Sequence, residues 1–469
     1  MSKYINFTKS ICFVAIAALL FLSCKKESFI DSSDAKLSIS VDSLFFDTVF
    51  TTVGSVTKSF KIFNNNDQKL RITQVKLGGG NSSVFKMNVD GTAGSEINNL
   101  EINSNDSLYV FVQVNVNPSA QTNPFLLLDS IQVTFNGNKR QVKLQAYGQN
   151  AIFLKNKKII GTENWNNNLP YVILGGLQVD TNAVLNIAAG TKIYVHADAP
   201  FLVDGTLNAN GTKDLPIIFT GDRTDEDYKN LPASWPGIYF RNTSKDNFLK
   251  HTVIKNAYQG IIAQQISTTA NPKVTLSQCI ITNIYDAGIL GINTNVNVDN
   301  TLISNCGSNV VLALGGNYRF VNCTVASYGN SFFDHKNPVL QVTDFITQDG
   351  TTLTGSLNAV FQNSIFWGEG GSVDNEIVVS KKGTGLFSVQ FDHVLYKVKV
   401  DPSPANFVAS IKNVSPLFDS INVSKGIFDF HFNKNPSAPA IDAGTPTSFL
   451  YDLDDKLRGV KPDIGCYEK

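Results

Sequence analysis

Three carboxylates lie in one Gly-rich run and a lysine follows shortly after it, and together they could support metal-ion or proton-transfer chemistry. The run GEGGSVDNE carries Glu369, Asp374 and Glu376, and Lys381 follows it shortly afterwards. Oxygen-rich loops can hold calcium, and an acid beside a base can carry out β-elimination. We therefore name Glu369, Asp374 and Lys381 as candidate catalytic residues and the three carboxylates as candidate calcium ligands. The alternative interpretation is a loop of solvated charges.

A second charged group is formed by the consecutive residues Asp334, His335 and Lys336. Asp334 and His335 could pair as acid and base, because an imidazole titrates close to neutral pH. Solvated charges on a loop are again the alternative.

Five aromatic residues could stack on sugar rings if the fold exposes them. They are Trp165, Tyr258, Tyr285, Trp367 and Trp235. The first four are candidate glycan-binding residues. Trp235 sits in the run SWPGI, and we expect it to pack at a corner of the fold instead.

The elements that must position these side chains are short strands with a repeating pattern. Six segments align from about residue 249 onward: LKHTVIKN, LSQCIITN, VDNTLISN, FVNCTVAS, FQNSIFWG and FDHVLY. The shortest step between them is about 22 residues, a repeat length typical of a solenoid. The longer steps predict inserted loops, and both charged groups fall in such loops.

The aligned columns are chemically uniform, which predicts their positions in each coil. One column is apolar and consists of Leu249, Leu276, Val298, Phe320, Phe361 and Phe391. A second apolar column contains Ile254, Ile281, Ile303, Val325 and Phe366. Polar columns follow at the expected corners, namely His251, Gln278, Asn300, Asn322, Asn363 and His393, and then Asn256, Asn283 and Asn305. Stacked amides can satisfy turn backbone groups, so we interpret these residues as structural ladders.

Four cysteines lie in the second half of the chain, namely Cys279, Cys306, Cys323 and Cys466, and they show no spacing typical of a metal site. Cys279 and Cys323 share one column two coils apart, which places them roughly 9–10 Å apart. That distance is too long for a disulfide. We expect buried free thiols that pack as small apolar groups.

The first coils resemble those of right-handed parallel β-helix proteins with a pectate-lyase-like fold. The resemblance rests on LNIAAGTKIYV, FLVDGTLNANGT, PIIFTG and SWPGIYF. Such proteins include polysaccharide lyases, glycoside hydrolases and non-catalytic adhesins, so the fold alone does not decide the function. The coils lack the Asn-Thr-Asp and Asp-Asp motifs of polygalacturonase-like enzymes. They also lack an Arg motif of the pectate-lyase kind, since Arg319 is the only arginine between Arg241 and Arg458.

The end of the sequence resembles the closing segment of many secreted bacterial β-helix proteins. It contains PSAPAIDAG, DLDDKLRG and DIGCYE, with Asp455 where Gly is usual and Cys466 where Ala is usual. A solenoid needs a cap over its open edge. We expect Asp442, Asp452, Arg458 and Asp463 to lock this cap, and a calcium site there is the alternative.

The N-terminal part has the rhythm of a β-sandwich. Six runs alternate apolar and polar residues between turn signals, and they predict six or seven strands. The opening FFDTV, a later Lys-Ser-Phe strand and an Asn-rich turn resemble the Ig-like domains of the abnormal-spindle and hydin type. Such modules bind partners or act as spacers.

The first residues predict export and lipid anchoring. Lys3 and Lys9 precede an apolar run of twelve residues, Ile11 to Leu22, which is too short to cross a bilayer comfortably. Ser23 and Cys24 then resemble the lipobox of bacterial lipoproteins, although Phe21 departs from its usual aliphatic residue. The resemblance implies a diacylglycerol on the sulfur of Cys24. Two acyl chains are enough to anchor a protein stably to a membrane. An ordinary signal peptide that contains a cysteine is the alternative.

Composition limits the function classes. The chain has 469 residues, and Lys+Arg and Asp+Glu are both 39, so no basic excess favours nucleic acid. We predict an all-β protein: signal peptide 1–23, tether 24–35, Ig-like sandwich 36–150, right-handed parallel β-helix 151–433 and cap 434–469.

The predicted function is that of an envelope lipoprotein of a Gram-negative bacterium, on the outer membrane or cell surface. We expect a monomer without a cofactor, or with calcium, that binds a polysaccharide or a surface protein. The alternative is a polysaccharide lyase or glycoside hydrolase. Convergence of Glu369, Asp374 and Lys381 in a groove would favour the enzyme.

Overall fold

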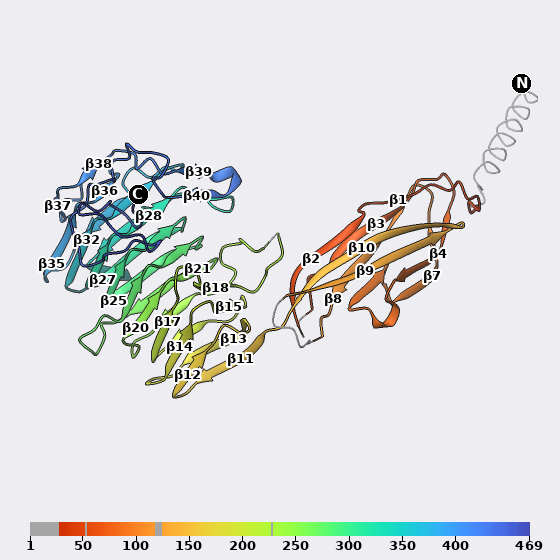
Figure 1. Cartoon of the computed structure of the whole chain (residues 1–469), viewed down its shortest axis with the longest axis horizontal. Helices are drawn as coiled ribbons and strands as arrows, with labels where there is room; N and C mark the ends of the chain where they lie inside the picture. Colours follow the sequence, from red (N-terminus) through yellow and green to blue (C-terminus); the bar gives the residue numbers. More distant parts are fainter. Residues whose placement is uncertain (1–27, 52–53, 118–123, 227) are drawn as a thin grey trace, which may run out of the picture. The chain divides into compact units, whose positions relative to one another are not determined.

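The computed structural model describes residues 28–51, 54–117, 124–226 and 228–469. Cys24, the signal peptide and most of the tether lie outside these residues. The chain divides into two compact units, 1–150 and 151–469, and nearly all regular structure in both is strand (Figure 1). In the part described, no helix is both long and apolar enough to cross a bilayer.

The first unit consists of two five-stranded sheets. One sheet has the order β1-β3-β8-β5-β6 and the other β2-β10-β9-β4-β7, and every pairing is antiparallel except that of β10 with β2. The first sheet contains β1 (Leu37–Ile39), β3 (Lys58–Asn64), β8 (Ser107–Val114), β5 (Phe85–Val89) and β6 (Thr92–Ala93). The second contains β2 (Ser43–Phe50), β10 (Asn138–Gln149), β9 (Phe125–Phe135), β4 (Leu70–Leu77) and β7 (Glu96–Ile102). A short 3-10 turn, η1 (Gly80–Ser82), connects β4 to β5.

Alternation of side chains explains this arrangement, since successive residues of a strand point to opposite faces. In β8, Leu108, Val110, Val112 and Val114 are buried while the residues between them are exposed. The buried residues of both sheets form one core. All six predicted runs are strands, and β5, β6 and β7 raise the number in the described part above the six or seven expected.

The second unit is dominated by one 26-stranded sheet whose pairings are all parallel. Successive strands return to pair with a strand one coil earlier, so three stacks of strands form three faces. This arrangement fits the predicted β-helix solenoid, and Figure 1 shows the stacked coils in yellow to blue. β11 (Ile152–Ile159) pairs along β13 (Tyr171–Val179), and the two halves of β13 then begin faces B and C.

We call the three stacks faces A, B and C. Face A contains β12 (Thr162–Trp165), β14 (Val184–Ala188), β17 (Thr206–Asn210), β20 (Asn247–Lys250), β23 (Val274–Ser277), the second halves of β25 (Ala287–Asp299) and β27 (Ser308–Val321), β32 (Leu357–Gln362), β35 (Phe387–Asp392) and β37 (Asn406–Val408). Face B contains β15 (Lys192–Val195), β18 (Ile217–Gly221), β21 (Thr252–Lys255), β24 (Ile280–Thr282), β26 (Leu302–Ser304), β28 (Thr324–Ser327), β33 (Ile365–Gly368), β36 (Leu395–Tyr396) and β38 (Ile411–Lys412). Face C contains β16 (Phe201–Val203), β19 (Ile238–Phe240), β22 (Ile261–Gln264), the first halves of β25 and β27, β29 (Leu340–Thr343) and β34 (Ile377–Ser380).

The register of face A confirms the first predicted apolar column. Leu249 pairs with Leu276, and the series continues through Val298, Phe320 and Phe361 to Phe391. The second column is confirmed on face B, from Ile254 to Phe366. The rings of Phe361 and Phe391 stack with centroids 4.8 Å apart. These columns fill the interior of the solenoid.

The predicted polar columns lie at corners of the coil. His251, Gln278, Asn300, Asn322, Asn363 and His393 all have φ between 40° and 53° and separate face A from face B. This left-handed conformation is unfavourable for most residues, and Asn adopts it more readily. Asn363 Nδ2 donates to Asn322 Oδ1 at 3.0 Å, as expected for a ladder.

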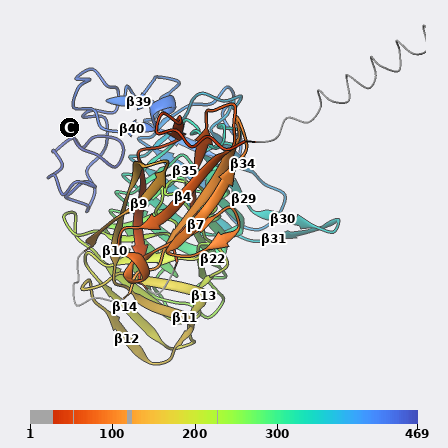
Figure 2. The same cartoon turned by 90° about the vertical axis from the view of Figure 1, so that its right-hand side faces the viewer.

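A C-terminal segment, residues 417–469, covers the outside of face B. It contains β39 (Ser420–Asn422), β40 (Ile427–Asp429) and the 3-10 turn η2 (Val423–Lys425). Its buried residues, among them Phe418, Phe432 and Tyr467, pack on Leu302, Ala326, Ile365, Trp367 and Leu395. The covering thus starts well before residue 434, where the sequence placed the cap, and it lies on a flank of the solenoid. The hairpin of β30 (Phe345–Gln348) and β31 (Thr351–Thr354) projects from the coils (Figure 2).

The same segment follows the A–B corner column from coil to coil. Thr445 exchanges hydrogen bonds with Asn363, Asn322 donates to Thr447, and Arg458 donates to Asn300. Gln278 then donates to Asp455 Oδ1 at 2.6 Å. The corner amides therefore bind the segment as well as each other, a role that the ladder interpretation lacked.

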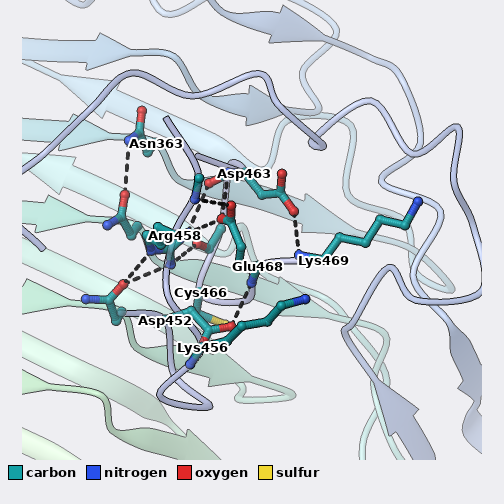
Figure 3. A network of polar contacts seen from close by, with 12 residues as sticks. Asn363, Asp452, Lys456, Arg458, Asp463, Cys466, Glu468 and Lys469 are labelled. Atoms are coloured by element: carbon teal, nitrogen blue, oxygen red, sulfur yellow. Dashed lines mark hydrogen bonds and ion pairs between the residues drawn. The ribbon is translucent and has the colours of Figure 1, made fainter. Parts of the chain in front are cut away.

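Arg458 is the centre of the polar network within this segment (Figure 3). Its buried guanidinium donates to Asn300, to the carbonyl oxygens of Asp463 and Gly465, and to Glu468. Asp452 and Asp463 accept backbone N–H groups of the segment. Of the four residues predicted to lock the cap, Asp452, Arg458 and Asp463 thus hold the segment through their side chains. The ionic partner of Arg458 is Glu468.

Candidate ligand-binding surfaces

The two charged groups named from the sequence lie in stacked loops at the corner from face B to face C. Asp334, His335 and Lys336 follow β28, and Glu369, Asp374 and Glu376 follow β33, which pairs with β28. The parallel pairing of these strands brings one residue of each loop together. His335 Nε2 lies 3.0 Å from Glu376 Oε1, and both side chains are almost fully buried.

The His335–Glu376 pair is sealed from solvent. Glu376 also accepts the backbone N–H of Val339. Gly368 lies directly beside the pair, where any Cβ would overlap Glu376 and His335. A substrate cannot reach this pair in the structure, so its geometry supports a role in holding the two loops together.

The remaining charged candidates do not converge. Glu369 accepts a hydrogen bond from Trp367 Nε1 at 2.8 Å. Asp374 lies 3.7 Å from Lys399 on the surface, and Lys381 lies over the ring of Phe387. Asp334 pairs with Lys336 in an exposed contact. Across the described ranges, no three His, Cys, Asp or Glu side chains are grouped to hold a metal ion. The convergence that would favour an enzyme at Glu369, Asp374 and Lys381 is therefore not seen.

The aromatic candidates separate into a buried and an exposed pair. Trp165 and Trp367 are 2% and 4% exposed, and Trp165 stacks on Tyr171 with centroids 4.2 Å apart. Neither indole offers a face to a ligand. Trp235 is fully buried and donates Nε1–H to Lys255 O at 2.9 Å, so the expected corner position is confirmed.

Tyr258 and Tyr285 form an exposed stacked pair. They occupy equivalent places on neighbouring coils, just after the B–C corners at Asn256 and Asn283. Their ring centroids are 5.6 Å apart, and the residues are 46% and 53% exposed. Beside them, Gln259 donates to Asp286 Oδ2 at 2.7 Å, which supplies polar groups next to the rings. Aromatic surface next to fixed polar groups is suited to a ring with apolar faces and hydroxyl edges.

Two pockets on the uncovered part of face B were missed by sequence reasoning. One, of about 190 Å³, is lined by Lys192, Tyr194, Ile218, Thr220, Gly221, Arg223, Thr224, Lys229 and Lys255. The other, of about 110 Å³, lies at the edge of the C-terminal segment and includes Lys213, His251, Val253, Ile280 and Asp454. The residues of each come from separate coils and loops. Aligning the columns one residue either side of the buried Ile193 and Ile254 would have revealed the shared outward face.

The second pocket is electrostatically compensated. Lys213 Nζ donates to Asp454 O at 2.6 Å, and His251 Nε2 lies 3.3 Å from Asp455 Oδ1. Burial lowers the pKa of His251 below its ordinary value, although Asp455 opposes this effect. His431 lies between Asp429 and Asp454 at 2.6 and 3.0 Å.

The thiols behave as the sequence predicts. Cys279, Cys306, Cys323 and Cys466 are all free and buried. Burial raises the pKa of Cys279 and of Cys306 to about 12, so neither is a reactive thiolate near neutral pH.

Comparison with known proteins does not add a family. No protein-family model matches the chain, and no curated protein matches it either. Among solved structures, it is similar to a family 123 glycoside hydrolase from Clostridium perfringens at 9% identity and a TM-score of 0.20, covering 26% of this chain and 30% of that chain. An alkylpurine DNA glycosylase from Pseudomonas fluorescens gives 6% identity and a TM-score of 0.15, covering 24% and 31%. Less than a third of either protein is spanned, and likeness at this level carries no inference about fold or function.

Proposed function

We propose that the chain is a lipid-anchored cell-envelope protein that displays a right-handed parallel β-helix and binds a glycan without cleaving it. In this proposal Cys24 carries the lipid on the outer membrane or cell surface. The N-terminal unit is an Ig-like spacer, and the segment 417–469 corresponds to the closing motif of secreted β-helix proteins.

The observation that carries the proposal is the exposed Tyr258–Tyr285 pair. Strand spacing along a solenoid is about 4.8 Å, which is close to the length of one sugar unit in an extended chain. Two rings on neighbouring coils can therefore contact consecutive sugars of one polysaccharide. The burial of His335 and Glu376 and the separation of Glu369, Asp374 and Lys381 support binding over cleavage.

A glycan array with the soluble 25–469 fragment tests this function. For a glycan that binds, replacing Tyr258 and Tyr285 with Ala should weaken binding about tenfold or more, equivalent to about 1.4 kcal/mol. The matched control replaces Tyr109 and Phe111, an exposed stacked pair in the first unit with centroids 5.6 Å apart. This control should bind as the unchanged fragment does.

Two results would count against the proposal. Equal loss in the control pair, or none in the Tyr258 and Tyr285 variant, would remove the tyrosine pair as the binding surface. Release of unsaturated sugar, followed by ultraviolet absorbance, would show a lyase instead. If that activity survived Ala at Glu369, Asp374 and Lys381, the reaction would belong to another site.

A further inference from the structure

The larger pocket on face B is built from three consecutive coils of the solenoid. Tyr194 on β15 pairs with Thr220 on β18, and Lys192 pairs with Ile218. Ile218 pairs in turn with Val253 on β21, two residues before Lys255. Ile218 and Thr220 thus form the floor, Lys192 lies one coil to one side, and Lys255 lies one coil to the other. Two coils separate the lysine backbones by about 9–10 Å along the axis.

Two of the cations that line the pocket, Arg223 and Lys229, are paired with carboxylates of the loop that follows β18. Arg223 makes two hydrogen bonds to Asp225, at 2.8 and 3.0 Å, and its guanidinium lies 3.8 Å from the ring centroid of Tyr228. Lys229 Nζ donates to Glu226 Oε1 at 2.6 Å. A planar guanidinium fixed from two sides is a preorganised donor.

Lys192 and Lys255 differ from these cations because no carboxylate of the described residues pairs with either. On the first coil, by contrast, Lys157 lies 3.0 Å from Glu163 and Lys158 lies 3.0 Å from Asp180. Lys255 is also partly buried, and desolvation together with Lys229 lowers its pKa. A cation held out of water beside another cation is unfavourable unless an anion compensates it.

We propose that this pocket binds an anionic group of an acidic glycan, with Lys192 and Lys255 contacting the charge from opposite sides. The shared chemistry is that of a carboxylate, sulfate ester or phosphate, all of which accept charge-assisted hydrogen bonds from ammonium and guanidinium groups. The floor of Ile218 and Thr220 gives the sugar ring an apolar contact and a hydroxyl. This inference rests on the proposed glycan-binding function and narrows it to acidic chains.

The test is calorimetric titration of the 25–469 fragment with a uronic acid trisaccharide. The comparison ligand is the same trisaccharide with its carboxylates reduced to alcohols, and inorganic sulfate and phosphate are titrated separately. We expect the acidic trisaccharide to bind at least tenfold more tightly than the reduced one or either free anion. Its affinity should fall as salt rises from 0.05 to about 0.5 M, because the Debye length shortens.

Variants then assign the binding to the pocket. Replacing Lys192 and Lys255 together with Ala should weaken the acidic trisaccharide about tenfold or more. Lys250→Ala is the matched control, since it removes a lysine of the same coil on face A, and it should bind as the unchanged fragment does. Circular dichroism and thermal unfolding verify that each variant is folded.

Three results would overturn the anion site. They are equal binding of the acidic and reduced ligands, unchanged affinity in the Lys192 and Lys255 variant, and free sulfate or phosphate binding as tightly as the trisaccharide. The Tyr258 and Tyr285 variant separates this inference from the general function. If the Tyr258 and Tyr285 variant binds all ligands normally but the Lys192 and Lys255 variant loses affinity for the acidic trisaccharide, the tyrosine pair is excluded as the binding surface and the anion site is supported.

Discussion

At the scale of single residues, the corners of the solenoid select their side chains by backbone conformation. From β20 onward, each coil turns from face A to face B through one residue with positive φ, and in three successive coils from Asn300 to Asn363 that residue is asparagine. The side chain then has a second task, because it must bind the neighbouring coil or the covering segment. Asn363 meets both demands.

Asn363→Ala should therefore destabilise the second unit by about 3 kcal/mol. The left-handed backbone costs a residue other than Gly or Asn about 1 kcal/mol. Each of the three lost hydrogen bonds, one to Asn322 and two with Thr445, contributes roughly another 0.5–1.5 kcal/mol. Denaturant unfolding measures the change.

Two control substitutions separate these terms. Asn363→Gly should recover about 1 kcal/mol, because glycine tolerates the positive φ. Asn182 is exposed and has φ 65°, and no hydrogen bond of its side chain is seen, so Asn182→Ala should cost only the backbone term. An Asn363→Ala variant no worse than Asn182→Ala would refute the role of the side chain.

The sequence predicts these corner residues well and the candidate site residues poorly, for a physical reason. Columns such as Leu249 to Phe391 repeat with the coil, and the period itself fixes the register. Trp165 and Trp367 are candidates by residue type alone, because an indole suits a sugar ring, but the direction of each side chain depends on local packing. Trp367 lies under the C-terminal segment, a long-range contact that no local pattern encodes.

At the scale of elements, a cluster of titratable groups within the C-terminal segment joins its β39–β40 hairpin to the turn around Asp454. Burial alone would lower the pKa of His431, but the hydrogen bonds that its ring donates to Asp429 and Asp454 raise it above its ordinary value of 6.5. The same histidine lowers the pKa of Asp429. Its ring also lies 3.8 Å from that of Tyr467, a core residue of the segment.

The packing of the β39–β40 hairpin within the segment should weaken as pH rises from 6.5 to about 8. Because the folded pKa of His431 is raised, its stabilising charge is fully present below 6.5 and is lost as pH passes the folded value. His431 and its two carboxylate partners are partly exposed, so we expect the charge to contribute at most about 1 kcal/mol to the free energy of unfolding. Limited proteolysis of the segment should become roughly two- to fivefold faster.

His431→Asn should abolish this pH dependence, and a dependence that persists in the variant would contradict the assignment. The window avoids two other groups. Burial lowers the pKa of His251, so its titration changes the stability only below pH 6.5. Burial lowers the pKa of Lys273 to about 8, so its titration changes the stability only from that pH upward. His251→Gln is the matched control, since Gln278 occupies the equivalent corner of the next coil, and it should keep the decline above pH 6.5.

The strands of both units could be predicted, but the path of this segment could not. Alternation and repeat length are local signals, and they gave the strands and the columns of the solenoid. The segment instead carries isolated residues, such as Arg458 and Thr445, that bind corner amides on different coils. A side chain that acts once leaves no repeat in the sequence to detect.

At the scale of the whole molecule, the chain combines two separately cored units with a predicted leader and anchor. The core of the first unit and those of the second share no residues. Each unit therefore has a hydrophobic core of its own. In the proposed function, the first unit and the tether connect the binding surface to the membrane.

Cys24→Ser should convert the full-length protein from membrane-bound to soluble. Two acyl chains anchor stably, and removing the thiol removes their point of attachment. Detergent phase partition of cell extracts measures the distribution. Cys12→Ser is the control, because that cysteine lies in the apolar run ahead of the cleavage point and should leave anchoring intact. Membrane association that persists in Cys24→Ser would exclude the lipid anchor.

The cover on face B also sets an order of events. All strands of face B precede residue 417 in the chain, so a ribosome makes the apolar flank before it makes the residues that hide it. Until Phe418, Phe432 and Tyr467 have been made and have packed, Leu302, Ile365 and Trp367 face water. A copy that ends before residue 417 would keep the core of the solenoid but expose an apolar stripe on face B, which chaperones and proteases recognise.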